Sequence, residues 1–201
     1  MEGVSGGATQ HTDVALLLVD LQNAYFEAPE LDEVKDELIQ RANELIEAAR
    51  DAGRPVVLVR TEHERDKSTW TINMLQDDEG FAFPGTAQAT YVEELDTDGG
   101  LDVTKTRDDA FHGTRLRAML TELRVSHVLI GGVSTHSCVA ETAMAAFAHD
   151  LHVAIAGDVI ASENPALSEA MLEFLKDELR QPVLDQAASI ALLREGPAEG
   201  E

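Results

Sequence analysis

The chain has 201 residues, and the 44% that are hydrophobic suffice for one domain with a sizeable core. No stretch approaches the roughly 18 apolar residues of a membrane span, and the N-terminus lacks the pattern of a secretory signal, so neither a membrane partner nor export is expected. The 38 acidic and 15 basic residues give a net charge of −23, which repels phosphate backbones and argues against a nucleic-acid partner.

Two features of the composition concern the surroundings of the protein. Its single cysteine, Cys138, cannot form an intramolecular disulfide, which fits a reducing environment and predicts a cytoplasmic location. The acidity fits either an ordinary acidic protein or the adaptation of a halophile to a salt-rich cytoplasm, where ionic strength screens self-repulsion. Unfolding in low and in molar salt separates the two interpretations, because equal stability in both contradicts salt adaptation.

Apolar runs of strand length alternate along the chain with helical patterns. In chain order we expect a strand at 14–20, a helix at 31–52, strands at 55–60 and 101–105, a helix at 114–124 with Thr114 as its N-cap, a strand at 127–133, a helix at 137–149, a strand at 152–158, a helix at 165–179, a strand at 182–184 and a helix at 186–193. The segment 61–100 is irregular apart from a short helix around 87–95. Small polar or acidic residues at 1–12 and 195–201 predict loose tails around a single domain at 13–194.

Apolar strands separated by amphipathic helices are typical of a parallel sheet covered on both faces. Right-handed crossovers then predict an α/β fold, a three-layer α/β/α sandwich with a doubly wound, mainly parallel sheet. In such folds ligands bind beyond the carboxyl ends of the strands. Asp20, Lys105 and the turn that leads to Cys138 all follow the ends of predicted strands, so we expect them at that edge.

Each of these three residues has a structural explanation as well as a chemical one. Cys138 lies where a helix is expected to begin, and the helix dipole and unpaired N–H groups there favour a thiolate and could receive an oxyanion. A lone cysteine near an apolar helix is, however, often only a small buried side chain. Asp20 could simply turn the chain, and Lys105 could simply be solvated. Together, the carboxylate can take the thiol proton as general base while the ammonium group favours the thiolate, and no histidine is needed.

Four segments carry a resemblance to a known family: LLLVDLQNAYF at 16–26, VVLVRTEH at 56–63, VTKTRDDAFHGTRL at 103–116 and IGGVSTHSCVAETAMAA at 130–146. In their order and spacing they resemble the isochorismatase-like hydrolases, the superfamily that includes nicotinamidase and N-carbamoylsarcosine amidase. The resemblance covers about residues 13–193.

The resemblance implies a role for each residue of the set. Asp20 is the base, Lys105 its charged partner and Cys138 the nucleophile of a catalytic triad. A non-proline cis peptide between Val133 and Ser134 turns the Ser134 N–H toward the substrate, where it forms an oxyanion hole with the Cys138 N–H. The implied reaction is acyl transfer, in which an amine leaves and water hydrolyses the thioester. The family commonly forms dimers or tetramers, so a homo-oligomer is expected.

One departure from the family bears on cofactor use. Nicotinamidases carry an Asp-x-His pair and a further histidine that hold a metal. Here the corresponding stretch is Thr-Glu-His-Glu-Arg, in which only His63 is in place and the nearby acids are Glu62, Glu64 and Asp66. We therefore predict no metal and no cofactor, and nicotinamidase activity becomes less expected. His63 is then either a substrate-pocket residue or a structural histidine.

The substrate pocket is less well defined. Gln22 could orient a polar group of the substrate, and aromatic candidates for the pocket mouth are Tyr25, Phe26, Trp70 and Phe111. Aromatic side chains are also common in cores, so both interpretations stay open.

These observations favour a metal-independent cysteine hydrolase, an amidohydrolase that cleaves a C–N bond of a small amide or carbamoyl compound through a thioester. One alternative is an isochorismatase-type ether hydrolase, against which Cys138 argues, because vinyl-ether hydrolysis needs no thiol nucleophile. The other is a catalytically silent binding or assembly module of the same fold, against which the intact set of Asp20, Lys105 and Cys138 argues. The substrate itself is not named by the sequence.

Overall fold

A parallel sheet forms the centre of the protein, for which the computed structural model describes residues 13–197. The sheet has six strands in the order β3-β2-β1-β4-β5-β6, and each neighbouring pair is parallel. The strands are β1 (Val14–Val19), β2 (Val56–Thr61), β3 (Leu101–Lys105), β4 (His127–Val133), β5 (His152–Ala161) and β6 (Val183–Leu184). The central strands β1, β2 and β4 carry apolar residues on both faces, because both faces are buried between helical layers.

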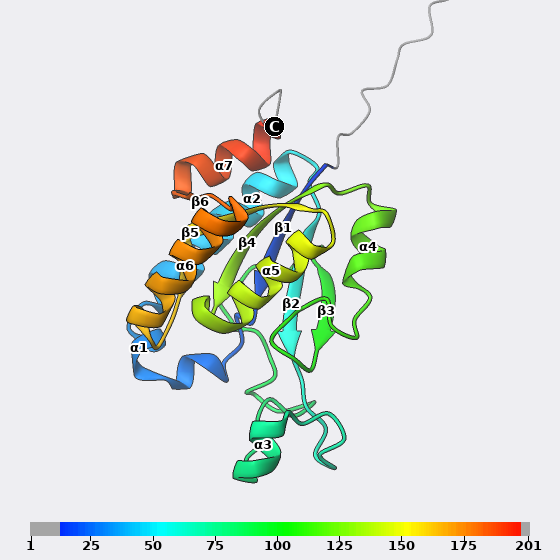
Figure 1. Cartoon of the computed structure of the whole chain (residues 1–201), viewed down its shortest axis with the longest axis vertical. Helices are drawn as coiled ribbons and strands as arrows, with labels where there is room; N and C mark the ends of the chain where they lie inside the picture. The colour runs from blue at the N-terminus through cyan, green and yellow to red at the C-terminus, as the bar shows by residue number, and fades with distance from the viewer. Residues whose placement is uncertain (1–12, 198–201) are drawn as a thin grey trace, which may run out of the picture.

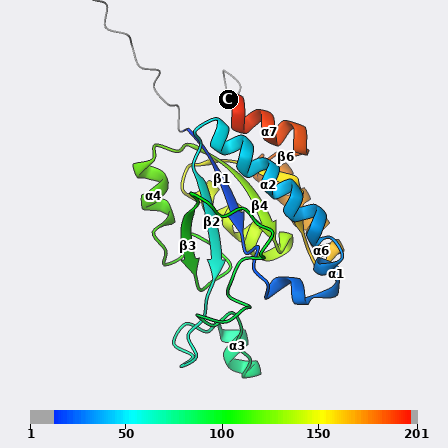
Figure 2. The same ribbon diagram turned by 180° about the vertical axis from the view of Figure 1, so that it is seen from behind.

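Helices cover both faces of the sheet, which confirms the predicted three-layer α/β/α sandwich (Figure 1). The helices are α1 (Pro29–Asp32), α2 (Lys35–Asp51), α3 (Ile72–Asp77), α4 (Leu116–Glu122), α5 (Ala140–Ala148), α6 (Pro165–Leu179) and α7 (Gln186–Glu195). Helices α4, α5 and α6 pack on one face, and α2 and α7 pack on the other, as the reverse view in Figure 2 shows. Within residues 13–197, none of these helices is long and apolar enough to cross a membrane.

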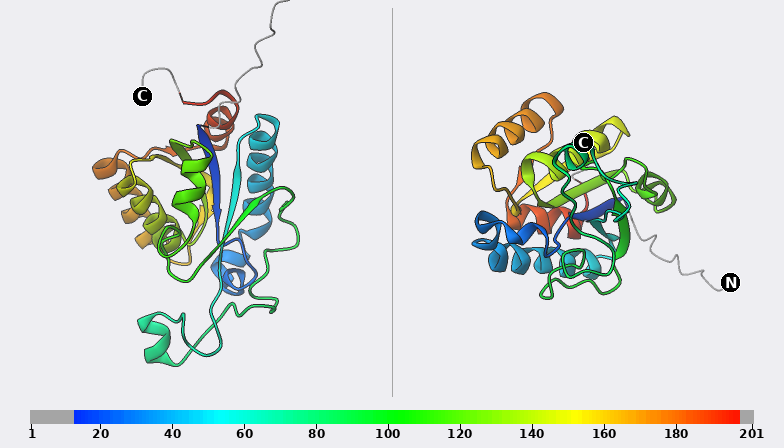
Figure 3. Two further views of the ribbon diagram at one scale, coloured as in Figure 1. Left: turned by 90° about the vertical axis from the view of Figure 1, so that its right-hand side faces the viewer. Right: turned by 90° about the horizontal axis from the view of Figure 1, so that it is seen from below.

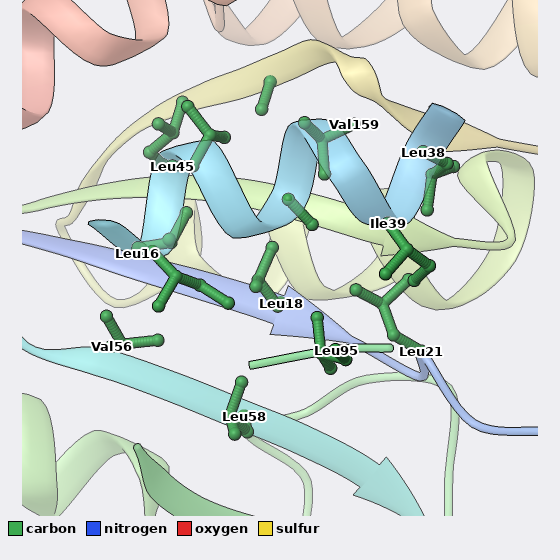
Figure 4. Close-up of a cluster of buried hydrophobic side chains, with 14 of the residues drawn as sticks. Leu16, Leu18, Leu21, Leu38, Ile39, Leu45, Val56, Leu58, Leu95 and Val159 are labelled. Carbon is green, nitrogen blue, oxygen red and sulfur yellow. The ribbon is translucent and has the colours of Figure 1, made fainter. Parts of the chain in front are cut away.

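The alternation of side chains along β1 assigns its residues to two hydrophobic clusters. Leu16 and Leu18 face α2, where they meet Leu38, Ile39 and Leu45 (Figure 4). The intervening residues, such as Leu17, point to the opposite face and join the cluster under α4, α5 and α6. Because both faces of β1 are buried, its register is fixed, and so is the position at which it ends.

Most elements lie where the sequence predicts them, but the segment between β2 and β3 does not. The expected helix at 87–95 is wrong. Its apolar residues recur at helical spacing, but the backbone of residues 88–92 bonds to residues 21–24, as in Val92 N–H to Leu21 O. The helix in this region is instead α3, none of whose side chains is buried. The segment projects beyond the carboxyl ends of the strands in Figure 3.

Several predicted boundaries also change, and the strand expected at 152–158 extends to Ala161 as β5. The helix expected at 31–52 is divided into α1 and α2, and α4 begins at Leu116 after Arg115, so Thr114 is not its N-cap. Thr114 Oγ1 instead donates to Ala110 O. The helix expected at 137–149 is the α-helix α5, preceded by a separate turn. Helix α7 includes Glu195, and the remaining expected tail residues at 1–12 and 198–201 lie outside the described residues.

Candidate active site

Four neighbouring strands end at the same edge of the sheet, and each brings one polar side chain there. Asp20 follows β1, Thr61 ends β2, Lys105 ends β3, and Cys138 lies in the turn after β4. Lys105 Nζ lies 2.8 Å from Asp20 Oδ2 and donates to Cys138 Sγ at 3.3 Å. The structure therefore brings together the three residues selected from the sequence, and the ammonium group contacts both the carboxylate and the sulfur.

The hydroxyl group of Thr61 links this set further. Thr61 Oγ1 donates to Asp20 Oδ1 at 3.0 Å and accepts from Lys105 Nζ at 2.8 Å. It also accepts from the Tyr25 hydroxyl at 3.1 Å. One short side chain thus fixes the carboxylate and the ammonium group relative to each other, which makes Thr61 a positioning residue of the site.

The charged pair is shielded from water. The exposed fraction is 0% for Asp20, 1% for Lys105 and 2% for Cys138. Burial alone would lower the pKa of Lys105, but the attraction of Asp20 and the contact with Cys138 outweigh it, so the pKa of Lys105 lies above its ordinary value. The ammonium group is therefore charged at neutral pH, and it compensates the buried Asp20 carboxylate.

The sulfur differs from the sequence expectation in its charge. Cys138 lies in η2 (Thr135–Val139), a π-helical turn that precedes α5, rather than in the first turn of the α-helix. Burial, and then the negative charge of Asp20, raise the pKa of Cys138 well above its ordinary value, while Lys105 lowers it. The resting group is a neutral thiol, and it has a second carboxylate nearby, because Cys138 Sγ donates to Asp108 Oδ1 at 3.6 Å.

Close backbone approach shapes the chain just before Cys138. Gly132 has a φ of 124°, and a Cβ there would lie 2.0 Å from the carbonyl oxygen of Val19, so only glycine fits. The peptide bond between Val133 and Ser134 is cis. The hydroxyl of Ser134 donates to Glu163 Oε2 at 2.5 Å, which ties this turn to the residues after β5.

Two of the pocket candidates lie beside the charged set. The Tyr25 hydroxyl donates to Thr61 Oγ1, which in turn contacts Asp20 and Lys105. Burial, and then the charge of Asp20, raise the pKa of Tyr25, so its phenol is neutral. The ring of Phe81 contacts Tyr25 at a centroid distance of 5.9 Å and His63 at 5.5 Å. Burial lowers the pKa of His63, so its ring is neutral near pH 7. Tyr25, Phe81 and His63 form a row of three contacting rings, which we call the aromatic wall.

The other pocket candidates have structural roles. The Gln22 side chain is buried, donates to Thr61 O and Ala89 O at 2.9 Å each, and accepts from Thr61 N–H at 2.7 Å, so it braces backbone and has no amide group left for a substrate. Phe26 and Phe111 pack in the clusters on opposite faces of the sheet.

Trp70 lies within the projecting segment rather than beside the charged set. It is 8% exposed, and its indole N–H donates to Glu64 O at 2.9 Å. Its ring lies 6.4 Å from that of Phe83.

Sequence reasoning missed Thr61, Asp108, Phe81 and Glu163. A signal existed for Thr61, because it ends an apolar strand as Lys105 does and reaches the same edge. Asp108 lies within the motif segment 103–116, but its position there does not reveal contact with the sulfur. Phe81 and Glu163 are placed by loops, whose paths no hydrophobic period indicates.

Comparisons with known proteins show the family and agree with the fold. The family model described as the isochorismatase domain matches residues 14–187. An Arabidopsis thaliana protein described as a probable inactive nicotinamidase is 28% identical over 179 residues, which are 85% of this chain and 91% of that protein. The crystal structure of an isochorismatase family protein from Desulfovibrio vulgaris is 26% identical with a TM-score of 0.78, covering 89% of this chain and 96% of that one. The pyrazinamidase of Pyrococcus horikoshii in complex with zinc is 25% identical with a TM-score of 0.73, covering 85% and 97%.

The residues of this chain do not fit a zinc ion of the kind that the pyrazinamidase structure holds. Thr61, at the place of the acid in the Asp-x-His pair, has its hydroxyl engaged by Asp20, Lys105 and Tyr25. His63 Nδ1 lies 3.2 Å from Thr69 O. Within 13–197, no three His, Cys, Asp or Glu side chains are grouped so as to hold a metal ion.

Proposed function

The chain belongs to the isochorismatase family, and from that premise we propose that it is a metal-independent cysteine hydrolase that cleaves a C–N bond of a small amide or carbamoyl compound. The observation that carries the proposal is the contact of one buried ammonium group, Lys105 Nζ, with both Asp20 and Cys138. A carboxylate, an ammonium group and a thiol in mutual contact provide a base, a compensating charge and a nucleophile.

The first half of the reaction is acylation. The neutral thiol gives its proton to Asp20 as the sulfur attacks the carbonyl carbon, and Lys105 compensates the negative charge that forms on the sulfur. The backbone N–H groups of Ser134 and Cys138 donate to the developing oxyanion. Asp20 then returns the proton to the leaving nitrogen, and an acyl thioester on Cys138 remains.

The second half repeats the proton transfer with water as the nucleophile. Water attacks the thioester carbonyl, and Asp20 takes a proton from it and gives that proton to the sulfur as the C–S bond breaks. The same two N–H groups stabilise the second oxyanion, and the carboxylic acid or carbamate product leaves with the thiol restored. Lys105 stays charged throughout, so the site needs no histidine in either half.

The aromatic wall supports a substrate with a flat or apolar part next to its reactive carbonyl. Tyr25 reaches the site through its bond to Thr61 and contacts Phe81, which contacts His63, and the neutral ring of His63 adds no charge that would select an anion. The proposal includes a small molecule as the substrate. A reducing cytoplasmic location and a homo-oligomer stay predictions, which cell fractionation and sedimentation test.

A second candidate is a silent module of the same fold. The Arabidopsis relative described as a probable inactive nicotinamidase favours it, as does the resting protonated state of Cys138. An ether hydrolase is the third reading, and it differs because its turnover does not need the thiol.

The experiment is a screen of amides, ureas and carbamoyl compounds that follows ammonia or amine release, with Cys138→Ala as the matched control. Amide turnover that Cys138→Ala abolishes supports the proposal. Because Cys138 is the only cysteine in the chain, intact mass of the acid-quenched protein assigns any acyl thioester to it. Turnover retained by Cys138→Ala favours the ether hydrolase, and neither turnover nor a covalent acyl adduct across the screen favours the silent module.

A further inference from the structure

We propose that Glu163 is a positioning residue that acts through Ser134 to hold the oxyanion-binding N–H groups in place. The inference rests on the proposed function, because it assigns the support of the same site. It concerns the turn Ser134–His136, called here the nucleophile turn, and the segment Ala161–Glu163 after β5, called here the clamp segment.

Every residue of the nucleophile turn is bonded to the clamp segment. The Ser134 hydroxyl donates to Glu163 Oε2 at 2.5 Å. Thr135 Oγ1 donates to Ala161 O at 3.0 Å. His136 Nδ1 lies 2.7 Å from Ser162 Oγ, and His136 Nε2 lies 3.7 Å from Glu163 Oε1. Three consecutive side chains thus contact three consecutive residues, which holds the turn along its length.

A register shift in the sheet places the clamp segment at this point. Ile130 of β4 pairs with Ile155 of β5, but Gly132 pairs with Ile160, so β5 uses three more residues than β4 between the two pairs. The shift sets Ala161 opposite Val133, at the very end of β4. The chain therefore enters the clamp segment beside the nucleophile turn.

Glu163 has features that a core-building residue lacks. Its side chain is 43% exposed, and both carboxylate oxygens are directed to the nucleophile turn rather than to the hydrophobic clusters. Its partner Ser134 is only 4% exposed. A charged acceptor on a buried hydroxyl gives a short and directional hydrogen bond, which restricts the backbone that carries the Ser134 N–H.

This arrangement predicts a selective effect on chemistry. Acyl transfer needs the Ser134 and Cys138 N–H groups aimed at an oxygen that becomes negative, and a small misplacement weakens that stabilisation. Alkylation of Cys138 by iodoacetamide displaces iodide at a saturated carbon. The carbonyl group of the reagent is not attacked, so this reaction forms no oxyanion. Loss of Glu163 should therefore slow acylation and leave alkylation unchanged.

The test compares the two reactions in Glu163→Ala, Glu163→Gln and the control Glu169→Ala, which removes an exposed carboxylate from nearby α6. The acyl probe is p-nitrophenyl acetate, whose burst phase reports acylation. We expect Glu163→Ala to slow the burst about 10- to 100-fold while its iodoacetamide rate stays within about twofold of wild type. Glu163→Gln should recover much of the burst, because its amide oxygen still accepts from Ser134, and Glu169→Ala should match wild type.

A double substitution adds a readout that a general structural role would not give. If Glu163 acts through Ser134, then Ser134→Ala, which keeps the backbone N–H, should slow the burst as well, and Ser134→Ala combined with Glu163→Ala should be no slower than the slower single variant. Equal losses of burst and alkylation in Glu163→Ala, no loss in either, or additive effects in the double variant would overturn the inference while leaving the hydrolase proposal standing. A wild-type protein that neither acylates nor turns over amides would overturn both.

Discussion

The strand-end cluster and helix α3 of the projecting segment differ in how far their side chains are buried, although both lie beyond the same edge of the sheet. The cluster (Asp20, Thr61, Lys105 and Cys138) is almost fully buried, and its members hydrogen-bond or ion-pair with one another. The projecting segment, residues 62–100, contains α3, which buries no side chain. Ile72 on that helix is 73% exposed.

The difference teaches that the sheet places the reactive side chains and that the projecting segment supplies two rings of the aromatic wall. Parallel strands deliver their end residues to one edge whatever the loops do, so the cluster depends on register. The segment contributes Phe81 and, at its first turn, His63, whose N–H donates to Ala82 O at 3.2 Å. Substitutions that remove charges or hydroxyl groups should therefore have large effects in the cluster and small ones in the segment.

The largest effect is expected from Lys105→Ala. It leaves the Asp20 carboxylate buried and without its compensating charge, which costs about 3–5 kcal/mol when one partner of a buried pair is lost. Amide turnover should be abolished, and urea unfolding should report the loss of stability. The matched control is Lys67→Ala in the segment, whose pair with Asp78 is exposed and should be worth about 0–1 kcal/mol. Equal losses in the two variants would contradict the comparison.

Thr61→Val should have the next largest effect. The valine methyl group cannot donate to Asp20 or accept from Lys105 and Tyr25, so buried polar groups lose partners at about 1–3 kcal/mol. Turnover should fall with stability, because the carboxylate that takes the thiol proton is no longer held. Thr61→Ser keeps the hydroxyl and should restore both quantities, as measured by urea unfolding and by kcat. Failure of Thr61→Ser to restore turnover would show that the threonine methyl, not the hydroxyl, is what the site needs.

How far the sequence could predict the molecule follows from the same contrast. The strands and the placement of Asp20 and Lys105 follow from apolar runs and the strand-end rule, which act locally. The charge state of Cys138 could not be predicted from these local patterns, because burial of its sulfur depends on how α5 packs. The spacing of Val92 and Leu95 resembles that of a helix. The backbone there instead bonds to residues that follow β1, as in Val92 N–H to Leu21 O.

A smaller effect, on rate alone, is expected from Asp108→Asn. Its carboxylate lies 3.6 Å from Cys138 Sγ and is one of the charges that raise the pKa of the thiol, after burial and Asp20. Removing that charge lowers the pKa of Cys138, so the thiolate fraction at pH 7 to 8 rises and iodoacetamide should react a few fold faster. Asp109→Asn, next in the chain, is the control. An unchanged rate in Asp108→Asn would place the carboxylate outside the electrostatic reach of the sulfur.

The smallest effect should come from His63, which lies where the two regions join. Burial lowers the pKa of His63 in the folded protein, so the folded state protonates the His63 ring less readily than the unfolded chain does. In the unfolded chain the pKa of a histidine is about 6.5. The associated stability is complete above that pH and is lost as the pH falls through the folded pKa. His63→Asn should therefore lose less free energy of unfolding between pH 8 and pH 5.5 than wild type does, and the same substitution at exposed His112 is measured beside it as the control for replacing a histidine. If His63→Asn and wild type lose equal free energy over this range, the His63 ring is solvated in the folded protein rather than enclosed beside Phe81.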